Sequence, residues 1–126
     1  MKAIANLISE IADYCSPESD VVLIGTGSSG LFLPGVASGL RAYDFSIVGY
    51  IFINSPLPGA ISLEHPNYEF FKSLPLLSDW PDAPVNYLWN EAEFKITAKE
   101  AELRGWQVLN QVNERIIEET ANSLFF

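Results

Sequence analysis

The sequence contains few of the residue types from which catalytic, metal and disulfide sites are built. Its 126 residues include one cysteine, Cys15, and one histidine, His65. A lone cysteine excludes an internal disulfide and is typical of a reducing compartment. Cys15 also falls on the apolar side of a helical pattern, which favours a buried thiol over a nucleophile.

Positive charge and long apolar runs are scarce as well. Seven basic residues stand against 16 acidic ones, giving a net charge of −9. Such a chain repels phosphate backbones and anionic membrane surfaces, so nucleic acid is excluded as an expected partner. Polar residues interrupt the apolar N-terminal segment, which predicts neither a signal peptide nor a membrane span. We therefore expect a soluble, cytoplasmic protein without membrane contact, metal or cofactor.

Apolar residues, in contrast, are plentiful enough for one core. They make up 48% of the chain, and no repeat or low-complexity linker divides it, so we expect a single domain over residues 1–126. Val21 to Ile24 is a continuous apolar run, which is typical of a strand buried on both faces of a parallel sheet. A glycine-rich turn and a helical pattern follow it directly.

Helical and strand patterns alternate along the rest of the chain. Apolar spacing predicts a helix over 4–15, and a strand is expected over 21–25. A helix over 28–43 contains Pro34, which indicates a late start or a kink. Further strands are expected over 47–54, 85–89 and 106–109, and helices over 67–74, from a capping box at Thr97 and Glu100 to Gly105, and from an N-cap at Asn113. These patterns predict an α/β fold with a small, mostly parallel sheet of about four strands.

Gly25 to Gly30 reads G-x-G-x-x-G between a strand and a helix and leaves several interpretations open. It fits a dinucleotide-binding turn, but the next strand ends in Asn54 where such folds carry an acidic residue, so nucleotide binding is the minority interpretation. The glycines also fit a purely structural role, in which they allow close packing of strand on helix. On the residues alone, that role has about the same weight as a binding site.

A third interpretation comes from a family resemblance. The segments VVLIGTGSSGLFLPGVASGL, IVGYIFINSPLP, DWPDAPVNYLWNEAEF and AKEAELRGWQVL resemble the C-terminal half of an α/β-hydrolase, from the strand that carries the nucleophile onward. The resemblance implies a truncated α/β-hydrolase-like domain. It places the G-x-S-x-G nucleophile elbow of that family on residues 25–29, with Gly27 at the nucleophile position.

The resemblance implies a catalytic triad that is incomplete. Ser28 is a nucleophile only if the elbow is displaced by one residue, Glu93 with its neighbour Glu91 occupies the position of the acid, and no histidine follows the last strand. A serine hydroxyl without a base is a poor nucleophile. His65, in the proline-rich segment, or a histidine of a partner chain is the remaining candidate base, although a loop histidine and a solvated pair of glutamates are the simpler interpretations.

We therefore expect a catalytically incomplete protein that binds a small molecule or a partner, with a serine hydrolase as the alternative. Ligands of open α/β sheets bind beyond the carboxyl ends of the strands. The ligand-binding candidates at that position are Gly25, Gly27, Ser28, Ser29, Asn54, Ser55 and Glu91.

The resemblance also has a consequence for assembly. The chain begins one helix before the elbow strand, so Val21 to Ile24 becomes an edge strand with the apolar sequence of a central one. Exposed apolar edges pair with other chains. We expect a homodimer or a companion subunit at this edge.

Overall fold

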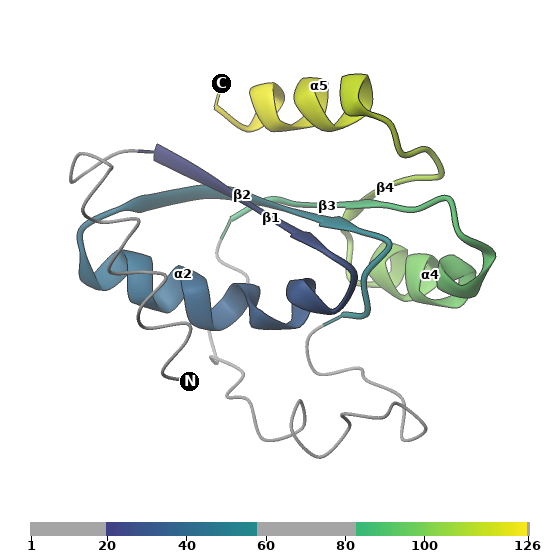
Figure 1. The fold of residues 1–126 in the computed structure, drawn as a ribbon, viewed down its shortest axis with the longest axis horizontal. Helices are drawn as coiled ribbons and strands as arrows, with labels where there is room; N and C mark the ends of the chain where they lie inside the picture. The colour runs from purple at the N-terminus through teal and green to yellow at the C-terminus, as the bar shows by residue number, and fades with distance from the viewer. Residues whose placement is uncertain (1–19, 58–82, 126) are drawn as a thin grey trace, which may run out of the picture.

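The computed structural model describes residues 20–57 and 83–125 (Figure 1). Cys15, His65 and the helices expected over 4–15 and 67–74 lie outside the described residues. Within them, four strands form one sheet: β1 (Asp20–Thr26), β2 (Ser46–Ile53), β3 (Val85–Leu88) and β4 (Gln107–Leu109). The strand order is β1-β2-β3-β4 and every pair is parallel, so the predicted small α/β class is confirmed.

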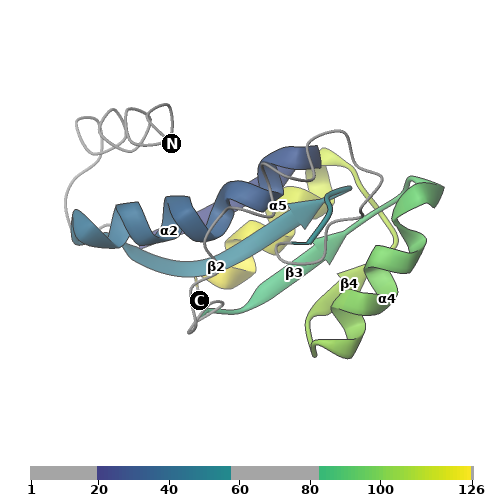
Figure 2. The same cartoon turned by 90° about the horizontal axis from the view of Figure 1, so that it is seen from below.

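Helices cover both faces of the sheet. α2 (Leu33–Ala42) and α4 (Lys95–Leu103) lie on one face, and α5 (Glu114–Leu124) lies on the other, as Figures 1 and 2 show. Two short 3-10 helices, η1 (Gly27–Phe32) and η2 (Ala92–Phe94), lead into α2 and α4. No helix in the described part of the chain is long and apolar enough to cross a membrane.

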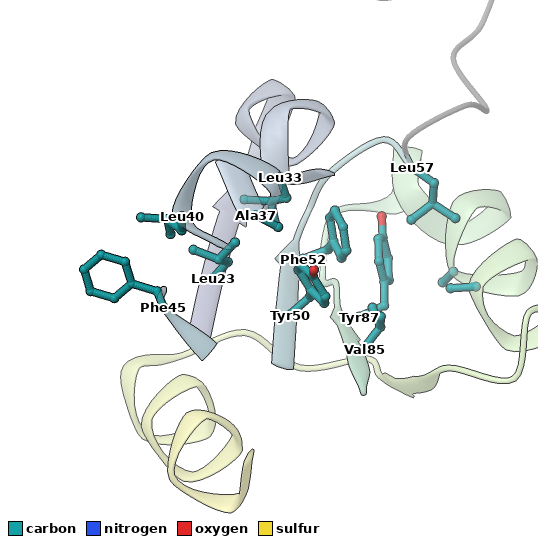
Figure 3. Packing of buried hydrophobic residues seen from close by; sticks show 12 residues of the cluster. Leu23, Leu33, Ala37, Leu40, Phe45, Tyr50, Phe52, Leu57, Val85 and Tyr87 are labelled. Atoms are coloured by element: carbon teal, nitrogen blue, oxygen red, sulfur yellow. The ribbon is translucent and has the colours of Figure 1, made fainter. Parts of the chain in front are cut away.

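β2 is the central strand of the core because both of its faces are covered. Tyr50 and Phe52 point towards α2 and α4, whereas Ile51 and Ile53 belong to the apolar cluster under α5. This is the packing that the continuous apolar run of β2 predicts. The larger cluster, most of it drawn in Figure 3, consists of Leu23, Leu33, Ala37, Leu40, Phe45, Tyr50, Phe52, Leu57, Val85, Tyr87, Ala98 and Ala101.

The helix expected over 28–43 starts late, as Pro34 indicates. Residues 27–32 form η1, and regular α-helix begins at Leu33 with Pro34 in its first turn. A first-turn proline costs no hydrogen bond, since the amides of that turn have no partner within the helix. Six residues of 3-10 helix therefore separate β1 from the regular α-helix.

The predicted capping box at Thr97 is wrong. α4 begins at Lys95, its N-cap is Phe94, and Thr97 lies inside the helix. The Thr97 side chain hydrogen-bonds to the phenol of Tyr87 instead of capping backbone amides. The predicted end near Gly105 is confirmed, because α4 ends at Leu103 and Gly105 adopts a φ of 83°.

The N-cap predicted at Asn113 is confirmed, because its side chain accepts a hydrogen bond of 2.9 Å from the backbone amide of Ile116. Such a cap contributes about 1 kcal/mol. At its other end α5 lies against β2: a Cβ added to Gly49 would be 2.6 Å from Cδ1 of Leu124. Gly49 thus allows α5 to approach the sheet closely.

Candidate functional site

The carboxyl edge of the sheet, where β1, β2 and β3 end at Thr26, Ile53 and Leu88, is the candidate site. Because the strands are parallel, the turns that follow them lie at one edge, where ligands of open α/β sheets bind. The residues after these strands include most of the predicted candidates.

The turn after β1 is fixed by hydrogen bonds between the side chain of Ser29 and the backbone of Thr26. Gly27 has a φ of 56°, in the left-handed region that side chains disfavour. The hydroxyl of Ser29 donates to the carbonyl of Thr26 at 2.6 Å and accepts from the amide of Thr26 at 2.9 Å. Ser28 has its backbone in η1, and its side chain lies outside the described part of the structure. Ser29 therefore stabilises the turn through its own side chain.

Gly25 and Gly30 allow close packing between β1, η1 and the turn after β2. A Cβ on Gly25 would lie 2.6 Å from Cα of Gly30, and a Cβ on Gly30 would overlap Oγ of Ser55. Ser55 is fully buried, and its hydroxyl donates to the carbonyl of Pro56 at 2.8 Å. At these two glycines the geometry agrees with the structural interpretation of the loop.

Asn54 joins the turn after β2 to the turn after β3. Its side-chain Oδ1 accepts from the amides of Asn90 at 3.0 Å and Glu91 at 3.3 Å, and its Nδ2 donates to Oδ1 of Asn90 at 2.9 Å. Its own amide donates to the carbonyl of Leu88 at 2.9 Å. Its φ of 43° is left-handed, a conformation that asparagine tolerates better than most residues. The parallel topology thus brings Asn54 and Glu91 together.

Tyr87 lies beneath this edge and connects three elements. Its phenol donates to the carbonyl of Ser55 at 2.5 Å and also hydrogen-bonds to Thr97 of α4. Burial raises the pKa of Tyr87 from 10.0 to about 12, against the lowering effect of those two bonds. Figure 3 shows the phenol of Tyr87 beside Phe52, near Leu57. Tyr87 is therefore a neutral donor that supports the turn after β2.

Two acidic candidates lie at the surface. Glu91 immediately precedes η2, Glu93 lies in its first turn, and both are exposed. His65 lies outside the described residues, so a triad of Ser28, Glu93 and His65 stays a prediction. In residues 20–57 and 83–125 no group of three or more His, Cys, Asp and Glu side chains could hold a metal ion.

Sequence reasoning missed two residues of this arrangement, Asn90 and Tyr87. Both depend on contacts between distant parts of the chain: Asn90 bonds to a residue 36 positions earlier, and Tyr87 to one 32 positions earlier. No local pattern marks either side chain. The only available signal was that both lie at or beside the end of a predicted strand.

Chemically, the carboxyl edge combines a fixed frame with an acidic surface. The hydroxyls of Ser29 and Ser55 donate to backbone carbonyls of their own turns, and the side-chain Oδ1 of Asn54 accepts from the backbone of the turn after β3. Glu91 and Glu93 are exposed beside them. Such an edge provides acceptors that suit a neutral or cationic hydrogen-bond donor better than an anion.

Comparison with known proteins adds no relative to this description. No protein-family model matches the sequence, and neither curated proteins nor solved structures give a match.

Proposed function

We propose that this chain is an α/β-hydrolase-like protein that binds a small molecule at the carboxyl edge and does not hydrolyse esters. The parallel sheet, with its glycine-rich strand-to-helix turn, supports the first part of the proposal. In α/β-hydrolases the nucleophilic serine occupies a sharp, strained turn of this kind.

The observation that carries the proposal is the φ of 56° at Gly27. The left-handed position that follows β1 belongs to a residue with no side chain, and the neighbouring hydroxyl of Ser29 is bonded to the backbone of Thr26. A turn built in this way presents no nucleophile at Gly27 or Ser29. Acyl transfer would require Ser28 together with a base, because an unassisted serine hydroxyl reacts poorly.

The charge of the carboxyl edge supports a neutral or cationic ligand. Glu91 and Glu93 lie exposed on a chain whose net charge is −9. Both long-range repulsion and local carboxylates disfavour anions there. An amine, an amidine or a polyol would instead donate hydrogen bonds to these oxygens.

Hydrolysis is tested with a fluorophosphonate probe and an activated ester, using the wild-type chain and Ser28→Ala. We expect no labelling and equal background ester cleavage for both proteins. Labelling of the wild type that Ser28→Ala abolishes, with loss of ester cleavage, would establish the serine hydrolase alternative.

Binding is tested by thermal stabilisation with matched panels of small amines, polyols, carboxylates and nucleotides. We expect saturable stabilisation by members of the first two panels, since a ligand at 100 times its dissociation constant adds about 2.7 kcal/mol. The double variant Glu91→Gln/Glu93→Gln should lose it, whereas Glu114→Gln/Glu118→Gln on α5 makes the same charge change and should keep it. Stabilisation by NAD or ATP alone would contradict the proposal and favour a nucleotide-binding turn.

The proposal extends to location and partners. The single cysteine supports a cytoplasmic location, and the acidic charge supports the absence of nucleic-acid partners. A homodimer or companion subunit that covers β1 completes the proposal.

A further inference from the structure

In the described part of the chain, the outer edge of β1 has little of what protects sheet edges, because its one charged residue is Asp20, at the start of the strand. In residues 20–57 and 83–125, β1 pairs with β2 alone. It is seven residues long, and the four residues that follow Asp20, Val21 to Ile24, include no charge and no proline. Edge strands that stay unpaired are usually short, charged or interrupted by proline.

An apolar side chain is exposed beside this edge. Val22 packs against the cluster under α5, and Ile24, two residues further along the strand, lies on the same face of the sheet. α5 packs on β2, yet 45% of Ile24 remains exposed. A sheet that continued past β1, with its own covering helix, would bury the exposed side chain of Ile24.

The sequence of β1 is complementary to itself in the antiparallel direction. When two copies are paired about Leu23, Leu23 faces its own equivalent and Val22 faces Ile24 of the second copy. Asp20 then faces Thr26, so no like charges oppose each other. A two-fold axis perpendicular to the sheet produces this arrangement, which is the commonest symmetry of protein dimers.

We propose that β1 pairs with β1 of a second copy of this chain in antiparallel register centred on Leu23, which joins two four-stranded sheets into one. This inference deepens the partner part of the proposed function by naming the partner and the register. The cross-strand contact between Val22 and Ile24 of the second copy is the expected source of specificity.

The proposed dimer should have an affinity that depends on ionic strength in a definite direction. Each copy carries a net charge of −9, so two copies repel each other while the contact itself is apolar. Screening reduces that repulsion. The dimer should therefore tighten as the ionic strength rises, opposite to an association held by complementary charges.

Sedimentation velocity of the full chain without ligand, from about 1 to about 100 μM, tests the oligomeric state. We expect a dimer that Ile24→Lys weakens by about tenfold or more, because the lysine would face Val22 of the second copy. Ile96→Lys is the matched control, since Ile96 is 81% exposed on α4, away from β1. A monomer throughout, or equal weakening by both variants, would overturn the proposal.

Disulfide trapping tests the register. Val22→Cys and Ile24→Cys are made separately in a Cys15→Ser chain, mixed and oxidised. Residues directly opposite in an antiparallel pair are within disulfide reach, so we expect the mixed disulfide to dominate. Predominance of either like-with-like disulfide, or none, would refute the register. Because no ligand is present in these experiments, a negative result leaves the binding proposal intact. Ester cleavage by a protein that forms this dimer would refute the proposed function and leave the dimer proposal intact.

Discussion

Asn54 and Asn90 form two hydrogen bonds with each other across the carboxyl edge of the sheet. The amide nitrogen of the Asn54 side chain donates to Oδ1 of Asn90 at 2.9 Å, and the backbone amide of Asn90 donates to Oδ1 of Asn54 at 3.0 Å. The two turns that follow β2 and β3 are thus fixed relative to each other. Any ligand at this edge meets a preformed surface, which lowers the entropy lost on binding.

Two substitutions at Asn54 distinguish the contribution of its side-chain hydrogen bonds to stability from that of its left-handed backbone conformation. Asn54→Gly retains the left-handed φ and loses the side-chain bonds, so we expect a loss of about 1–2 kcal/mol in the free energy of unfolding. Asn54→Ala should cost about 1 kcal/mol more, because its Cβ is strained at this φ. Urea unfolding measures both, with exposed Asn110→Ala as control. Equal losses for Gly and Ala would show that the backbone conformation contributes nothing.

Because Gly30 and Ser55 are in close contact, substitutions at the two positions should have non-additive effects on the free energy of unfolding. Gly30→Ala places a Cβ against Oγ of Ser55 and 2.9 Å from Cδ1 of Phe52, so we expect destabilisation of about 1–3 kcal/mol. Ser55→Ala removes the overlapping oxygen, and the double variant should lose less than the sum of the two single ones. A double-mutant cycle by urea unfolding gives the coupling. Strict additivity would mean that the turn moves away from the added methyl group.

Gly27 and Gly35 should respond oppositely to the same substitution. Neither has an atom within 4 Å of an added Cβ, but Gly27 has a φ of 56° and Gly35 lies within α2. Gly27→Ala should cost about 1–2 kcal/mol through left-handed strain. Gly35→Ala should gain about 0.5–1 kcal/mol, because alanine is the better helix former. Thermal unfolding compares the two, and stabilisation by Gly27→Ala would contradict a left-handed conformation at Gly27.

We expect the raised pKa of Tyr87 to make the stability of the folded chain sensitive to alkaline pH. Its pKa is raised by burial to about 12, so between pH 10 and 12 the folded chain binds a proton that the unfolded chain has released. The contribution of this phenol to stability is complete below pH 10 and declines above it, by at most about 1.4 kcal/mol per pH unit.

The measurement is urea unfolding of the wild type and of Tyr87→Phe from neutral to alkaline pH. The variant should lose about 1–3 kcal/mol at neutral pH, because the carbonyl of Ser55 loses its donor, and should decline less above pH 10. Tyr43→Phe, whose side chain is 48% exposed, is the control. Parallel pH profiles for the wild type and Tyr87→Phe would refute the role of this phenol.

Much of the fold could be predicted because it depends on local apolar patterns. The apolar runs that give β1 and β2 predict their positions to within one residue at each end, and Pro34 predicts the late start of α2. The capping-box prediction at Thr97 was wrong because a threonine with a glutamate three residues later is equally compatible with a helix interior. Its hydroxyl has a partner on β3 that only the folded chain brings near.

The candidate site was only partly predictable for the same reason. Parallel topology places Asn54 and Glu91 at one edge, but it does not indicate that Asn90 completes the link. Likewise, the glycine pattern is compatible with a phosphate cradle and with close packing. The choice at Gly30 depends on where Ser55 lies, which requires the folded turn after β2.

The strand order β1-β2-β3-β4 follows the order of the chain, and this bears on how the protein is assembled during synthesis. Each described strand lies beside the one that precedes it in the chain, so this sheet can form in chain order without inserting a late strand between earlier ones. α5, which follows all four strands in the chain, covers Ile51, Ile53 and Leu88 on the second face. Until it docks, that face exposes apolar surface, the condition under which nascent chains aggregate.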